Sequence, residues 1–150
     1  MSEVRYVTLG PLHSGEGSRA VLGLGLGDSG AAPVVLVQAP EALARDPELV
    51  EQLRRETARA CVLEHPHILG VYGLAALDGG YARVTEYADG ETLRRVLERV
   101  GRLPAALAVR VLADVAMGVH YAHLAGNDDG TPLVHGDLRP ETLMLGYDGT

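Results

Sequence analysis

The chain has 150 residues, 47% of them hydrophobic, and this length suits a single domain that buries roughly 70% of its unfolded surface. Its formal net charge of −7 argues against a nucleic-acid partner, because few cations would remain to neutralise phosphates. The single cysteine, Cys61, excludes an internal disulfide, and no segment suggests a signal peptide or a membrane span, so we expect a soluble cytoplasmic protein.

The first part of the chain has the pattern of a strand hairpin. Apolar residues predict strands at 4–12 and 19–24, with a polar, glycine-containing segment at 13–18. Such a turn lets backbone N–H groups approach phosphate oxygens, but an ordinary hairpin turn explains the segment equally well, and both interpretations stay open. Residues 25–30 match the glycine pattern of a dinucleotide site. Because a strand follows them instead of a helix, we predict a flexible strand connection.

A strand at 34–37 then ends at Gln38, and a helix follows. Asp46 has the character of an N-cap, with a proline at the first helical position and an acidic first turn. Helical spacing places four apolar residues near one face, which we expect to be buried: Leu49, Leu53, Ala60 and Leu63.

Two histidines, His65 and His67, lie before the next predicted strand at 71–72. Further ligands at useful spacing are missing, so we interpret this pair as structural and expect no metal site. Segments 74–77 and 81–84 flank a turn and predict a hairpin.

The pattern changes from strand to helix after residue 90. Apolar spacing predicts a helix at 93–100, ended by Gly101, and a longer one from about 104 to 124. The chain closes on a polar loop between two apolar runs, at 133–134 and 143–145, which we expect to be buried and strand-like. Pro140 prevents the loop from becoming helical, and Asp137 in it is a candidate proton acceptor.

These landmarks, in this order, resemble the protein kinase family, in particular the bacterial, eukaryotic-like Ser/Thr protein kinases. They are the strand ending at Gln38, the helical Glu56, the His-Pro pair at 65–66, the segment Thr-Glu-Tyr-Ala-Asp-Gly at 85–90 and His-Gly-Asp at 135–137. The resemblance implies an α+β fold. A five-stranded antiparallel N-lobe with one helix, residues 1–87, would precede a partial helical C-lobe, residues 88–150, that stops before the Asp-Phe-Gly metal-binding segment.

The resemblance also implies roles for the polar residues, several of them altered. Asp137 takes the catalytic-base position, and Arg139 stands in for a neighbouring lysine. Thr142 takes the position of a metal-binding asparagine, and Gly136 that of an arginine. Gln38 takes the position of the lysine that binds phosphates and pairs with Glu56; glutamine is neutral, whereas lysine carries a full charge.

The nucleotide would contact a second set of positions. In the glycine-rich loop, only one of three glycines is kept, since His13, Gly15 and Ser18 take those positions. The remaining implied contacts are Ala20 after that loop, Leu36 in place of a small alanine beside the adenine, Thr85 at the back of the pocket, the hinge residues Glu86 and Ala88, and Met144.

Because phosphoryl transfer depends on positioning and charge, these departures favour an inactive, pseudokinase-like module that acts by binding. Its partner would be another protein or a further domain of the same polypeptide. One alternative is a divergent active Ser/Thr kinase that uses ATP and Mg²⁺ and takes its cation from elsewhere, for example Arg19. A second alternative is a small-molecule kinase of the aminoglycoside or choline type, whose loop also resembles His-Gly-Asp-Leu. We expect ATP and Mg²⁺ as cofactors only for the divergent active kinase, and otherwise the sequence does not identify a cofactor.

Overall fold

The computed structural model describes residues 4–12, 19–77, 79–126 and 129–150. Contacts within the chain divide it into two compact units, which we describe one at a time. The first unit comprises Met1–Val62 and Gly70–Tyr87, and the second comprises Leu63–Leu69 and Ala88–Thr150. The short segment Leu63–Leu69, which the sequence analysis assigns to the N-lobe, therefore groups with the second unit.

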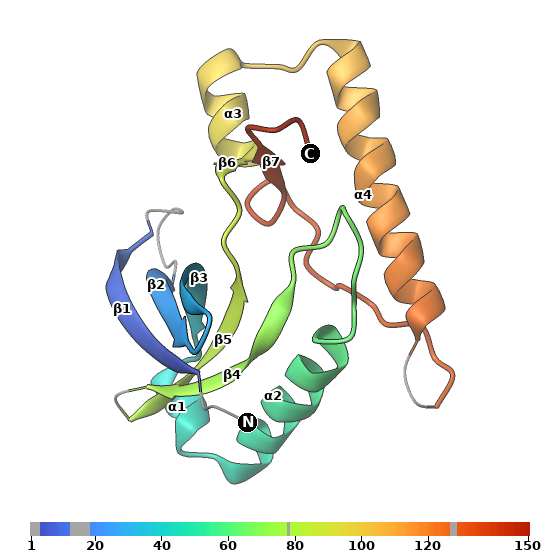
Figure 1. Cartoon of the computed structure of the whole chain (residues 1–150). Coiled ribbons are helices and arrows are strands. Elements are labelled where there is room, and N and C mark those ends of the chain that lie inside the picture. Colours follow the sequence, from blue (N-terminus) through green and yellow to red (C-terminus); the bar gives the residue numbers. More distant parts are fainter. Residues whose placement is uncertain (1–3, 13–18, 78, 127–128) are drawn as a thin grey trace. The chain divides into compact units, whose positions relative to one another are not determined.

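The first unit is built on a strongly curved sheet, seen in Figure 1. It has five strands, ordered β1-β2-β3-β5-β4, and all neighbours are antiparallel, as predicted. The strands are β1 (Arg5–Pro11), β2 (Ala20–Gly27), β3 (Gly30–Gln38), β4 (Val71–Leu77) and β5 (Gly80–Glu86).

The connections between these strands follow local chemistry. Residues 25–30 form the ends of β2 and β3 and the tight turn between them, which confirms the predicted strand connection. The two short segments predicted at 71–72 and 74–77 are one strand, β4. Its register shifts between Val71 and Gly73, and Gly73 has a φ of 148°, a conformation that a side chain disfavours.

The core of the first unit lies on one face of the sheet. Val34, Leu36, Ala82 and Val84 there are 0–3% exposed. A Cβ on Gly23 of β2 would lie 2.8 Å from the Leu36 Cδ1 and 2.9 Å from the backbone carbonyl oxygen of Val7, so the strand favours a glycine there. Burial of each larger side chain contributes roughly 1.5–3 kcal/mol, which makes this cluster the main stabilising element of the unit.

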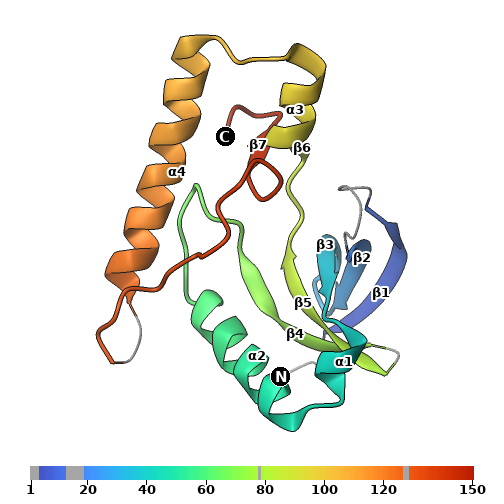
Figure 2. The ribbon, with the colours of Figure 1, turned by 180° about the vertical axis from the view of Figure 1, so that it is seen from behind.

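Two helices follow β3. The unpredicted α1 (Glu41–Ala44) is a single turn, and α2 (Pro47–Ala60) lies along β4 in both Figure 1 and Figure 2. Asp46 caps α2 as predicted, because its carboxylate accepts hydrogen bonds from the backbone N–H groups of Glu48 (3.0 Å) and Leu49 (3.3 Å). The predicted buried face is wrong in part: Leu49 is 43% exposed, whereas Thr57 is only 2% exposed.

The second unit contains two helices and a small sheet. Its elements are β6 (Gly90–Thr92), α3 (Leu93–Val100), α4 (Ala105–Ala125) and β7 (Met144–Gly146). Figure 2 shows the β6–β7 pair between the two helices. Both predicted helices are confirmed, and Gly101 ends α3 with a φ of 76°. Gly118 brings α4 against the segment Leu63–Leu69, since a Cβ there would lie 3.0 Å from the carbonyl oxygen of His67.

One expectation for this unit is wrong. Val134 is 69% exposed, and residues 133–134 form no strand. Only the apolar run that follows the loop is half-buried and forms a strand, β7. In addition, the 21-residue helix α4 reaches a mean hydropathy of 1.3 in its most apolar window. By length and composition alone it is apolar enough to cross a membrane.

Candidate functional site

The end of β3 presents Val37, and not Gln38, to the helix α2. Val37 pairs across the sheet with Arg83 of β5, and the Nε of Arg83 lies 3.4 Å from the hydroxyl oxygen of Thr57 on α2. Cross-strand partners share one face of a sheet, so Val37 belongs to the face that α2 covers. Gln38 instead pairs with the fully buried Ala82, on the opposite face.

Glu56 lies on the exposed side of α2. Its carboxylate accepts a hydrogen bond of 2.8 Å from the side-chain amide of Gln52, one turn earlier. Within the part of the chain that the structure describes, Glu56 makes no ion pair with a lysine or arginine. The pairing of this carboxylate with a strand cation, which the resemblance implies, is thus not formed by Gln38 or by Val37.

The remaining predicted nucleotide positions of the first unit lie on different sides of the sheet. Leu36 is fully buried in the core, on the face opposite α2. Ala20 is half-buried at the start of β2 and pairs with Val37, so it shares the face of α2. Gly15 and Ser18, together with His13, lie outside the described residues.

The end of β5 is fixed by polar contacts. The Thr85 hydroxyl lies 3.5 Å from the carbonyl oxygens of Val35 and of Glu86, and its single proton serves one of them at a time. The Glu86 carboxylate accepts a hydrogen bond of 2.9 Å from the backbone N–H of Gly70, and its own N–H donates to the Gly70 carbonyl at 2.8 Å. Glu86 therefore joins the end of β5 to the residue before β4.

In the second unit, Asp137 lies in an exposed loop and is already paired with a cation. Its carboxylate is 3.0 Å from the Nε of Arg139, and both side chains are more than half exposed, at 57% and 59%. The backbone N–H of Asp137 donates to the Nδ1 of His135 at 3.1 Å. The arrangement leaves the carboxylate accessible to solvent, with a guanidinium beside it.

Thr142 closes this loop on itself. Its hydroxyl oxygen lies 2.7 Å from the carbonyl oxygen of Asp137 and 3.0 Å from that of Arg139, and it accepts a hydrogen bond of 3.2 Å from the Arg139 N–H. Gly136 has a φ of 76°, so the glycine at the position of the family's arginine adopts a left-handed conformation that an arginine would strain.

The loop is also attached to the start of α3, through contacts that could not be predicted from the sequence. The Arg94 Nε lies 2.7 Å from the Glu141 carboxylate, and the backbone N–H groups of Leu93 and Arg94 donate to the carbonyls of Leu143 (2.8 Å) and Pro140 (2.9 Å). The hydrogen bond from Arg94 lowers the pKa of the Glu141 carboxyl. Met144 continues the loop into β7, while Ala88 is half-buried before β6.

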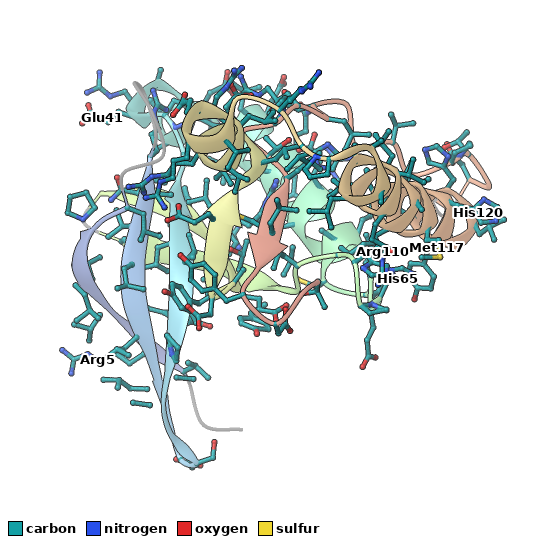
Figure 3. The ribbon with its side chains drawn as sticks, turned by 90° about the horizontal axis from the view of Figure 1, so that it is seen from above. Arg5, Glu41, His65, Arg110, Met117 and His120 are labelled. Carbon is teal, nitrogen blue, oxygen red and sulfur yellow. The ribbon has the colours of Figure 1, made fainter. Side chains whose placement is uncertain are left out.

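The two histidines form part of a structural cluster on α4. His65 stacks on Tyr121 with ring centroids 5.0 Å apart, and the His67 Nε2 lies 3.6 Å from an oxygen of Asp114. Arg110 pairs with the other oxygen of Asp114 at 2.7 Å, and Figure 3 labels Arg110 and His65. Among the described residues, no group of three or more His, Cys, Asp or Glu side chains could hold a metal ion.

Comparison with known proteins identifies the family. The protein kinase domain profile matches residues 14–150, and the chain belongs to this family. The PknI kinase domain of Mycobacterium tuberculosis superposes with a TM-score of 0.73 and 27% identity, covering 94% of this chain and 54% of that one. The resemblance and the fold class inferred from the sequence are thereby confirmed.

Similar proteins include bacterial kinases much longer than this chain. The Ser/Thr-protein kinase PkaB of Streptomyces coelicolor is 38% identical over 135 residues, which cover 90% of this chain and 30% of the relative. The tyrosine-protein kinase MasK of Myxococcus xanthus is 38% identical over 113 residues, covering 71% of this chain and 18% of the relative. The chain thus spans less than a third of either relative.

Proposed function

We propose that this protein kinase domain is catalytically inactive and acts by binding another protein or another domain of its own polypeptide. The observation that carries the proposal is Val37 on the α2 face at the end of β3. In active kinases the lysine of β3 neutralises the nucleotide phosphates and pairs with the helix glutamate. We assign this position to Val37, and its hydrocarbon side chain supplies neither a charge nor a donor.

The polar loop of the second unit supports the same conclusion. Thr142 stands where the family has a metal-binding asparagine, and its short hydroxyl lies among backbone groups of the loop. The Thr142 hydroxyl, held in this way, fits poorly with a bound Mg²⁺, which prefers several free oxygen ligands in octahedral geometry. Removal of one such electrostatic group costs on the order of 10²–10³ in rate.

An active Ser/Thr kinase is the alternative, and the names of the relatives favour it. PkaB and the mycobacterial PknB proteins are named as Ser/Thr-protein kinases, and Asp137 is retained and exposed. An active enzyme would require a cation from another position to replace the strand lysine. We further propose a cytoplasmic location.

Nucleotide binding separates these functions. We expect ATP, with or without Mg²⁺, to leave the thermal melting of the protein unchanged, because the charge that binds the phosphates is absent. A Mg²⁺-dependent rise of several degrees would contradict this. The control is adenosine, which lacks phosphates: a rise with adenosine as well as with ATP would indicate a site that holds the base without activating the phosphates, consistent with an inactive kinase domain.

A further inference from the structure

Among the described residues, two side-chain contacts join α2 to strand β5, and both involve arginines. The Arg83 Nε on β5 donates to the Thr57 hydroxyl on α2 at 3.4 Å. The Arg54 guanidinium on α2 lies over the ring of Tyr81 on β5, with its Cζ 5.4 Å from the ring centroid. Tyr81 and Arg83 are two residues apart in one strand, so both side chains point to the same face, toward α2.

The contact between Arg83 and Thr57 is the more constrained of the two. Thr57 is 2% exposed and is the one buried residue of α2. A buried hydroxyl without a partner is costly, and the Arg83 guanidinium, which is always charged, supplies a donor at this point. This contact fixes the position of α2 relative to β5.

Arg83 also stands directly beside the position of the missing strand cation. It is the cross-strand partner of Val37, so its side chain starts from the neighbouring strand on the same face of the sheet. Residues directly opposite on antiparallel strands have Cβ atoms roughly 4.5–5.5 Å apart. A positive charge that is absent from the end of β3 is therefore present one strand away, directed at the helix that carries Glu56.

We infer that Arg83 is a positioning residue that holds α2 against the sheet from β5, through Thr57, in place of the pairing between a β3 lysine and the α2 glutamate. In active kinases that ion pair must be formed before phosphoryl transfer, and the position of the helix is a point of control. Here the contact comes from β5, so the helix is attached without the residue at the phosphate-binding position of β3. The inference does not depend on the absence of catalysis, since an active kinase could use the same contact.

Amide hydrogen exchange of residues 47–60, followed by mass spectrometry, tests the inference. The variants are Arg83→Met, Thr57→Val and the double variant. Arg55→Met is the matched control, because it removes an equal charge from the exposed side of the same helix. Loss of a hydrogen bond to a charged group should make amide exchange roughly ten- to a hundredfold faster. We expect this acceleration in α2 for both single variants and little further change in the double variant, because both remove the same contact.

Two further variants distinguish loss of this contact from a general loss of packing. Arg83→Lys, which keeps a charged donor, should recover part of the protection, whereas a general loss of packing would not be recovered. If Arg83→Met does not fold, Thr57→Val carries the test, since valine has nearly the same shape as threonine. Unchanged exchange in α2 for Thr57→Val, or equal acceleration in Arg55→Met, would overturn the inference.

An added nucleotide distinguishes this inference from the proposed function. If ATP with Mg²⁺ slows exchange in α2 of the unmodified protein, the proposed absence of nucleotide binding fails, while the coupling of Arg83 to Thr57 can still be measured. If the variants leave α2 unchanged, the role of Arg83 fails, whatever ATP does.

Discussion

Val37 and Arg83 face each other across β3 and β5, on the side of the sheet that α2 covers. The pair places a hydrocarbon at the position that we assign to the family's phosphate-binding lysine, and a guanidinium on the adjacent strand. The assignment of Val37 is the basis for the expected loss of nucleotide binding, and Arg83 is the basis for the proposed attachment of the helix.

The first prediction concerns the strand position itself. Val37→Lys should raise the affinity for ATP with Mg²⁺ by about tenfold, because it introduces a charged donor on the face of α2. Val37 is 41% exposed, so the change should cost no more than about 1 kcal/mol of stability. Isothermal titration calorimetry measures the affinity, and denaturant unfolding measures the stability.

Gln38→Lys is the matched control for this experiment. It adds the same charge one residue further on, on the opposite face of the sheet. We expect no gain in affinity from it. An equal gain from both variants would mean that the assignment of Val37 to the lysine position is incorrect.

The second prediction uses Cys61 to report on the Arg83 charge. Burial raises the pKa of the Cys61 thiol, and the positive charge of Arg83 lowers it again in part. Arg83→Met should therefore move this pKa further upward, so that alkylation by iodoacetamide slows at a fixed pH, because only the thiolate reacts. The pH profile of the alkylation rate measures the shift. A profile that stays in place would show that Arg83 lies away from Cys61.

The third prediction concerns Gly136. Because its φ is 76°, Gly136→Ala should destabilise the protein by about 1 kcal/mol through strain in the left-handed conformation. Gly10→Ala is the control, since Gly10 lacks a positive φ and a Cβ there would meet nothing within 4 Å. Urea unfolding of both variants gives the comparison, and equal effects would argue against a strained position at 136.

The fourth prediction is a pH dependence. The hydrogen bond from Arg94 lowers the pKa of Glu141 below its ordinary value of 4.5. A carboxyl whose folded pKa is lowered stabilises the folded state above its unfolded pKa, and this stabilisation is lost as the pH falls through the folded value. We expect the attachment of the loop to α3 to weaken below about pH 4.5. The Glu141 side chain is one-third exposed, at 33%, so the effect should be small.

NMR titration of the Glu141 carboxyl measures this shift directly. Arg94→Gln should return the pKa toward its ordinary value, because it removes the charged donor. The control is Arg102→Gln, which removes an arginine from the segment between α3 and α4. A shift of Glu141 that persists in Arg94→Gln would assign it to another cause.

Much of the architecture could be predicted from the sequence because local chemistry specifies it. Asp46 and Pro47 mark the start of α2, and Gly101 marks the end of α3, through capping geometry that each residue type favours. The order of landmarks around Glu56 and Asp137 identified the family, and the solved PknI kinase domain confirms the fold.

The register of β3 could not be predicted for a physical reason. Residues 34–37 are all apolar, so the strand lacks the alternation that tells one face from the other. Moving the strand register by one residue exchanges the two faces of the strand. The choice between Val37 and Gln38 as the residue that faces α2 depends on such a one-residue difference. The pairings with Ala82 and Arg83, which lie far along the chain, are what determine the faces.

The contacts of two threonines also could not be predicted, because they depend on the tertiary structure. In the sequence, Thr57 has the character of an ordinary helix residue, and only the folded structure shows its contact with Arg83. The sequence places Thr142 at the position of a metal ligand, and the structure shows its hydroxyl bonded to backbone carbonyls of its own loop. Polar residues of this kind are interpretable only once their partners are known.

The most direct test of the central claim is transfer of labelled γ-phosphate from ATP by the unmodified protein, compared with Asp137→Asn. The family resemblance assigns Asp137 to the catalytic-base position, and on this assignment a kinase reaction of the domain must depend on it. We predict no transfer above the level of the Asp137→Asn protein. Transfer that is present in the unmodified protein and abolished in Asp137→Asn would contradict the assignment of an inactive kinase domain.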